Sequence, residues 1–130
     1  MEHVGTCRCG QLQARCAGAP IRVSVCHCLN CQKRSGSAFA AQARWLDADV
    51  TLKGAFSEWS HLGESGNRAV FRFCAVCGST VTFASDGMPG MTAVAIGAFA
   101  NPLFPAPQFS NYEDRKHAWV AVLGDAVERH

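Results

Sequence analysis

The 130-residue chain has no long apolar run and little excess of charge of either sign. Its most apolar stretch, residues 92–100, is far shorter than the roughly 18 uncharged residues that a membrane span needs. Twelve basic and ten acidic residues are too evenly balanced for a typical polyanion binder. We therefore expect neither a membrane nor a nucleic acid as a partner.

The first residues also lack the basic and apolar segments of a secretory signal, so we expect a cytoplasmic protein whose thiols stay reduced. Fixed repeats, low-complexity segments and linker-like stretches are missing as well. Hydrophobic residues make up 48% of the chain and charged residues 17%, which excludes an intrinsically disordered protein. The length suits one domain, residues 1–130, that can bury a real core.

Alternating apolar and polar residues predict half-buried strands of antiparallel sheets. The alternation is present in residues 11–16, 21–25, 69–73 and 79–83. Residues 92–99 and 118–123 are apolar on both faces and are predicted as central strands. One short helix is expected at residues 29–35. The fold class is therefore mainly β, in several small sheets.

Eight cysteines are the strongest departure from average composition. Seven of them stand in three groups with short spacings, which are Cys7-Arg8-Cys9-Gly10, Cys26-His27-Cys28-Leu29-Asn30-Cys31 and Cys74-Ala75-Val76-Cys77-Gly78. At this cysteine frequency chance gives about half of one C-x-x-C and half of one C-x-C pair. The chain has two of each. A disulfide framework is the alternative, and a reducing compartment disfavours it.

Zinc accounts for the first and last groups together. A C-x-x-C-G turn places two sulfurs around one ion, and its glycine permits the positive φ that such a turn often needs. Cys74 and Cys77 fit this pattern, and Cys7 and Cys9 are the natural second pair. A four-cysteine site of this kind contributes on the order of 10 kcal/mol to folding.

The middle group, Cys26, Cys28 and Cys31, forms an incomplete shell of three ligands. Catalytic zinc sites commonly combine three protein ligands with one open position, which here suits a soft ligand such as an incoming thiol. A zinc-bound thiol is deprotonated and is therefore a nucleophile at neutral pH. A redox thiol cluster is the alternative interpretation of these three residues.

The sequence resembles the family of glutathione-dependent formaldehyde-activating enzymes, which includes the centromere-protein-V-like domains. The resemblance runs from Gly5 to about Trp119. The segments that carry it are Gly5-Thr6-Cys7-Arg8-Cys9-Gly10, Cys26-His27-Cys28-Leu29-Asn30-Cys31-Gln32-Lys33 with Gly36, Phe73-Cys74-Ala75-Val76-Cys77-Gly78-Ser79, and Ala95-Ile96-Gly97-Ala98-Phe99 with Asn101, Pro102 and Pro107.

The resemblance implies a β-tent fold, made of several coiled antiparallel sheets with a rubredoxin-like zinc knuckle and little helix. It also implies two zinc ions, one structural and one catalytic. The structural zinc would be held by Cys7, Cys9, Cys74 and Cys77, and the catalytic one by Cys26, Cys28 and Cys31. In named family members the reaction joins glutathione and formaldehyde to S-hydroxymethylglutathione, a carbon–sulfur lyase activity.

Three classes of function are consistent with the sequence. The first is a zinc-dependent carbon–sulfur lyase that adds a small thiol such as glutathione to a small carbonyl compound, or releases it. The second is a non-catalytic, zinc-stapled binding module, and the third is a thiol-redox or metal-handling protein. The sequence does not identify the natural thiol, its carbonyl partner or the oligomeric state.

Four further residues have candidate roles in the site or in the core. Lys33 and Arg34 follow the middle group and can bind the carboxylates of glutathione, or they can be a solvated helix end. Cys16 shares the apolar face of its strand and is predicted to fill the core. His27 lies between two expected ligands, where a neighbour usually points away from the metal; a fourth ligand or a proton shuttle are its other possible roles.

Overall fold

A computed structural model of the chain describes residues 1–63 and 65–130. The secondary structure in these residues is mainly strand, as predicted, with one α-helix. The elements in chain order are β1 (Glu2–Thr6), β2 (Gln13–Ala17), β3 (Arg22–Cys26), α1 (Leu29–Ser35), β4 (Ala40–Leu46), η1 (Asp47–Asp49), β5 (Val50–Lys53), β6 (Phe56–Leu62), β7 (Arg68–Cys74), β8 (Thr80–Ser85), β9 (Met91–Ala95), η2 (Ile96–Phe99), β10 (Phe109–Asn111), η3 (Glu113–Arg115) and β11 (Glu128–Arg129), where η marks a 3-10 helix.

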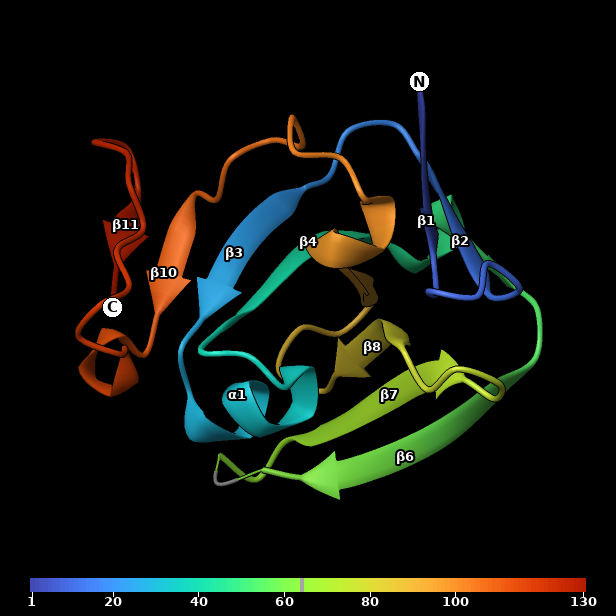
Figure 1. Cartoon of the computed structure of the whole chain (residues 1–130), viewed down its shortest axis with the longest axis horizontal. Helices are drawn as coiled ribbons and strands as arrows, with labels where there is room; N and C mark the ends of the chain where they lie inside the picture. Colours follow the sequence, from blue (N-terminus) through green and yellow to red (C-terminus); the bar gives the residue numbers. More distant parts are fainter. Residues whose placement is uncertain (64) are drawn as a thin grey trace.

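The strands form a small sheet and a large one. The small sheet has the antiparallel order β1-β2-β5, and the large one has the order β11-β10-β3-β4-β9-β8-β7-β6. The predicted antiparallel arrangement is confirmed, with one addition: β10 runs parallel to both β3 and β11. Parallel pairing needs a long connection, which residues 27–108 supply between β3 and β10 and residues 112–127 between β10 and β11. The large sheet curves, so that α1 lies between β3 on one side and β6 and β7 on the other (Figure 1).

The two faces of the large sheet have different roles. Val23, Ala43 and Val94 are cross-strand neighbours on one face and belong to the hydrophobic core. Strand β2 contributes Ala14 and Cys16 to the same core, and Leu12 just before it also belongs there; all three are fully buried. Cys16 is therefore a core residue, as predicted. The other face of the large sheet carries polar and aromatic side chains, and it borders the candidate site.

Helix α1 has the predicted bounds, and local signals at both ends explain them. Cys28 is the N-cap residue, and its Sγ accepts a hydrogen bond from the backbone N–H of Cys31. Gly36 ends the helix in the left-handed conformation, with φ 65°, and its N–H donates to the carbonyl of Gln32. Lys33 and Arg34 lie in the last turn, where cations favourably meet the helix dipole.

Two predicted strands differ in the structure. Residues 92–99 are a strand only as far as Ala95 and continue as a 3-10 helix. Residues 118–123 are not a strand; Trp119 and Leu123 are 76% and 84% exposed, and Val120 alone is buried among the large apolar residues of this run. The position beside β10 at this edge of the sheet is occupied by β11 and not by this run.

None of the helices in the described residues is long and apolar enough to cross a bilayer.

Candidate metal centres

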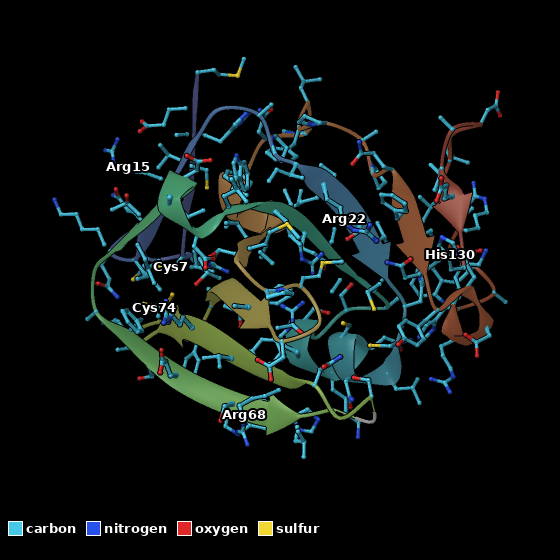
Figure 2. All side chains as sticks on the ribbon, turned by 180° about the vertical axis from the view of Figure 1, so that it is seen from behind. Cys7, Arg15, Arg22, Arg68, Cys74 and His130 are labelled. Atoms are coloured by element: carbon cyan, nitrogen blue, oxygen red, sulfur yellow. The ribbon has the colours of Figure 1, made fainter. Side chains whose placement is uncertain are left out.

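The four-cysteine group lies where the two sheets meet. Cys7 and Cys9 follow β1 in the turn toward β2, whereas Cys74 ends β7 and Cys77 precedes β8. The four Sγ atoms all lie within 4.8 Å of one another. Figure 2 shows Cys7 and Cys74 close together although 67 positions separate them. The cluster therefore joins the first hairpin to a late one, as the spacing predicts.

Sulfur–sulfur distances in this group suit a tetrahedral zinc ion. With Zn–S near 2.3 Å, tetrahedral geometry sets neighbouring sulfurs about 3.8 Å apart. Cys9 Sγ lies 3.5 Å from Cys7 Sγ and 3.7 Å from Cys74 Sγ. A disulfide would need about 2.05 Å, and all eight cysteines are free thiols. The residues present thus fit a structural zinc ion.

Glycines and backbone amides shape both turns around the sulfurs. Gly10 and Gly78, which follow the two pairs, have φ of 87° and 80°, a conformation that side chains with a Cβ rarely adopt. Cys74 Sγ accepts hydrogen bonds from the backbone N–H groups of Val76 and Cys77, each 3.3 Å long. Donors aimed at sulfur stabilise a thiolate, and hence the form that binds a metal.

Hydrogen bonds also make three of these thiols differ in acidity. Hydrogen bonds from the Ser79 hydroxyl and backbone lower the pKa of Cys77 to about 5. Burial raises the pKa of Cys74, but the Cys77 backbone N–H and the Gln11 side-chain amide outweigh it and bring the value to about 7. The Gln11 backbone N–H lowers the pKa of Cys9, but contacts with the neighbouring cysteine thiols, first that of Cys7, together with desolvation raise this pKa to about 11. Two of the thiols are therefore readily ionised and attract a cation.

The three-cysteine group lies at the junction of β3 and α1. Cys26 ends the strand, Cys28 caps the helix and Cys31 lies in its first turn, so a short segment brings all three sulfurs within 4.8 Å of one another. Among the described residues, no fourth His, Cys, Asp or Glu joins this group. The arrangement can hold a metal ion with three protein ligands, which is the donor set of an open zinc site.

Mutual hydrogen bonds make these three thiols unequal. Donation from Cys31 lowers the pKa of Cys26. The same contact raises the pKa of Cys31, and burial raises that of Cys28. Cys26 is thus the first of the three to ionise. Metal binding must displace the remaining protons, and so metal affinity depends on pH.

A cavity of about 370 Å³ lies beside the three-cysteine group, and we call it the thiol cavity. Cys26 and Cys31 line it directly, together with Gln42 and Arg44 of β4 and Phe83 of β8. A small molecule that enters this cavity meets two of the three cysteines.

His27 points away from the sulfurs and into a buried polar network. Its side chain is fully buried, and its Nε2 lies 2.9 Å from Ser110 Oγ. The Ser110 hydroxyl donates its proton to Glu113 Oε2, at 2.5 Å, so Nε2 is the donor to Ser110. Burial lowers the pKa of His27, against the Glu113 carboxylate, which raises it. Sequence analysis did not identify Ser110 or Glu113, because no local motif marks them.

The two cationic candidates differ in their surroundings. The Arg34 guanidinium lies 4.7 Å from the ring centroid of Phe83 and 5.5 Å from that of Phe71. Arg34 also lines a second cavity, of about 680 Å³, together with Cys7 and Ser79 of the four-cysteine region. Lys33 is exposed to solvent. Arg34 is therefore the better placed of the two to meet a ligand.

Comparisons with known proteins agree with the cysteine pattern. The family model described as glutathione-dependent formaldehyde-activating enzyme matches residues 2–120. A search of curated proteins found no match. Three chains among solved structures match. One is the crystal structure of a Rhodobacter sphaeroides protein, with a TM-score of 0.59 and 23% identity over 76% of this chain and 91% of that one. At this identity the structural likeness supports the fold alone.

Proposed function

Because this chain belongs to the family of glutathione-dependent formaldehyde-activating enzymes, we propose that it is a zinc-dependent carbon–sulfur lyase. Residues 1–130 would form one zinc-binding domain. The reaction would add a thiol to formaldehyde or another small carbonyl compound, or reverse that addition. The carbon–sulfur bond forms between the thiol sulfur and the carbonyl carbon, and the thiol proton ends on the carbonyl oxygen.

The observation that carries the proposal is the open side of the three-cysteine group. Cys26, Cys28 and Cys31 would hold the catalytic zinc, and two of these residues line the thiol cavity. Zinc bound there would supply a Lewis acid that lowers the pKa of a substrate thiol. Since no fourth ligand joins the group in the described part of the chain, a closed, purely structural site is disfavoured.

Cys7, Cys9, Cys74 and Cys77 would hold the structural zinc. This site would fix the small sheet against β7 and β8 and so maintain the fold around the thiol cavity. Both sites need reduced cysteines, so the proposal places the protein in a reducing compartment such as the cytoplasm.

Glutathione is proposed as the thiol, and its carboxylates need cations. Arg34 is proposed to bind one of them, because its guanidinium lies 4.7 Å from the ring centroid of Phe83, a residue that lines the thiol cavity. Lys33, which precedes it in the helix, is proposed as a second, solvent-exposed cation.

The test is adduct exchange between glutathione and formaldehyde, followed by NMR, with zinc-loaded protein. We expect the wild type to accelerate exchange and Cys28→Ser to fall to the uncatalysed rate. Cys16→Ala is the matched control, because it removes a cysteine that lies in the core and outside both groups. A wild-type rate no higher than that of Cys28→Ser would exclude glutathione–formaldehyde chemistry.

A further inference from the structure

The wall of the thiol cavity is built from one face of the large sheet. Strand register places Ser24, Gln42 and Ala95 in one row of cross-strand neighbours, and Arg44, Ala93 and Phe83 in the next. Directly opposed side chains share a face of the sheet. The two alanines of β9 leave room between the polar residues of β4 and the ring of Phe83. Gln42 and Arg44 therefore face a space that a ligand can fill.

Arg44 is a partly buried cation without an acidic partner among the residues that the structure describes. Its Nη1 donates to Ser24 Oγ at 3.3 Å, and its guanidinium lies 5.8 Å from the Phe83 ring centroid. None of the ion pairs within 4.0 Å that occur in the described residues involves Arg44. Burial and the neighbouring Arg22 lower its pKa. A partly desolvated guanidinium of this kind gains most from an anion that enters the cavity.

The described neighbours neutralise this cation only in part, because the Cys26 and Cys31 thiols raise its pKa less than burial and Arg22 lower it. Arg22, directly opposite Arg44 on β3, adds a second positive charge and stacks 3.7 Å from the ring centroid of Phe109 (Figure 2 labels Arg22 on its strand). Asp114 also lines the thiol cavity, but its side chain is largely exposed and its carboxylate pairs with Arg115 Nε at 3.3 Å. The local charge around Arg44 therefore favours an anionic ligand.

Gln42 provides independent evidence that this cavity binds a ligand. Its side chain is 3% exposed and lines the same cavity. The amide Nε2 donates to Ser24 Oγ at 2.8 Å, but Oε1 is buried without a hydrogen-bond partner among the described residues. A buried acceptor that is left unpaired is unfavourable. A ligand N–H or O–H would satisfy it.

We propose that Arg44 and Gln42 form a recognition subsite for the thiol substrate, which carries a carboxylate for the Arg44 guanidinium and an N–H donor for Gln42 Oε1. Small amino-acid or peptide thiols have this combination. The proposal rests on the proposed function, since it takes the ligand's sulfur to sit at the three-cysteine group. Within that function it assigns two specificity-determining residues on β4 that lie outside every cysteine motif.

Binding to the zinc-loaded protein tests the carboxylate contact without any turnover. The probes are 3-mercaptopropionate and 3-mercapto-1-propanol, which have the same chain length and differ in the terminal group. Calorimetry should show that the wild type binds the carboxylate thiol about tenfold or more tightly than the alcohol, as expected for a charge-assisted contact. A ratio near one, or no binding of either thiol, would overturn the proposal without reference to any variant.

Two variants then test whether Arg44 causes the preference for the carboxylate thiol. Arg44→Gln should reduce the ratio to about twofold or less, while Arg68→Gln should leave it unchanged. Arg68 lies on the same sheet and is exposed, with its Nη1 bonded to Ser60 Oγ. Equal weakening of both thiols by Arg44→Gln would contradict the proposal, because it would mean that Arg44 only supports the metal site. Metal content and circular dichroism confirm that each variant is folded and loaded.

Gln42→Met tests the second contact. This substitution keeps the size of the side chain but removes the acceptor. It should weaken N-acetylcysteine, which has both a carboxylate and an N–H, and should leave 3-mercaptopropionate, which lacks the N–H, unaffected. Equal effects on both ligands would overturn the role of Gln42. The exchange assay with formaldehyde is a separate measurement, so a failure of lyase activity is distinguishable from a failure of thiol recognition.

Discussion

The imidazole of His27 donates a hydrogen bond from Nε2 to the hydroxyl of Ser110, 2.9 Å away and 83 positions later in the chain. The contact is possible because β10 lies parallel to β3, with Asn111 beside Cys26. It anchors the segment between Cys26 and Cys28 to the other end of the protein. Cys26 and Cys28 therefore flank a residue, His27, whose position is fixed by this hydrogen bond.

Ser110→Ala should destabilise the protein by about 1–3 kcal/mol, because it leaves a buried imidazole N–H without its acceptor. Urea unfolding of the zinc-loaded protein measures the change. Ser57→Ala, at an exposed position of β6, is the control and should change stability by less than about 0.5 kcal/mol. Equal stability of the two variants would show that the network contributes nothing to the fold.

Gly78→Ala should cost about 1 kcal/mol or more, because the residue has φ of 80° and L-residues avoid this conformation. A Cβ at this position would meet no atom within 4 Å, so the cost is conformational and not steric. Gly97→Ala is the matched control, since a Cβ there also meets nothing and φ is not positive. Thermal unfolding should separate the two variants, and identical midpoints would argue against a strained turn.

Cys74→Ser should remove the structural metal and much of a stabilisation on the order of 10 kcal/mol, a large share of what a domain of this size has. Cys28→Ser should lose one equivalent of zinc and keep the fold. Metal analysis and far-ultraviolet circular dichroism of the two variants measure the difference. If Cys28→Ser unfolds and Cys74→Ser does not, the structural and catalytic assignments are reversed.

Stepwise chelation should remove the two metals in a fixed order. The three-cysteine site lies against an open cavity and has fewer protein ligands, so it should release zinc first. Lyase activity should disappear with the first equivalent while the circular dichroism signal persists. Loss of secondary structure during the first release would contradict this order.

Local patterns predicted the elements that have local causes. The bounds of α1 follow from its cap residues, and alternation located β2, β3, β7 and β8. Strand β4 was missed although its residues 41–45 alternate between apolar and polar, and β6 was missed because nearly all of its residues are exposed. The short spacings also identified both cysteine groups, since a metal site imposes its geometry on the sequence.

The surroundings of the sites could not be predicted in this way. Gln42 and Arg44 reach the thiol cavity through the register of β3, β4 and β9, and Ser110 reaches His27 through a parallel pairing. Such contacts depend on which strands become neighbours. The sequence of a single strand does not show which neighbours it will have. The residues proposed to select the substrate are therefore visible only in the folded chain.

Zinc K-edge X-ray absorption of the fully loaded protein tests the division of seven sulfurs into a closed and an open site most directly. With two zinc ions per chain, the account predicts an average of about 3.5 sulfurs per zinc, rising to about 4 when glutathione is added. An average of 4 sulfurs that glutathione does not change would show that both sites are closed. That result would contradict an open, thiol-binding metal centre.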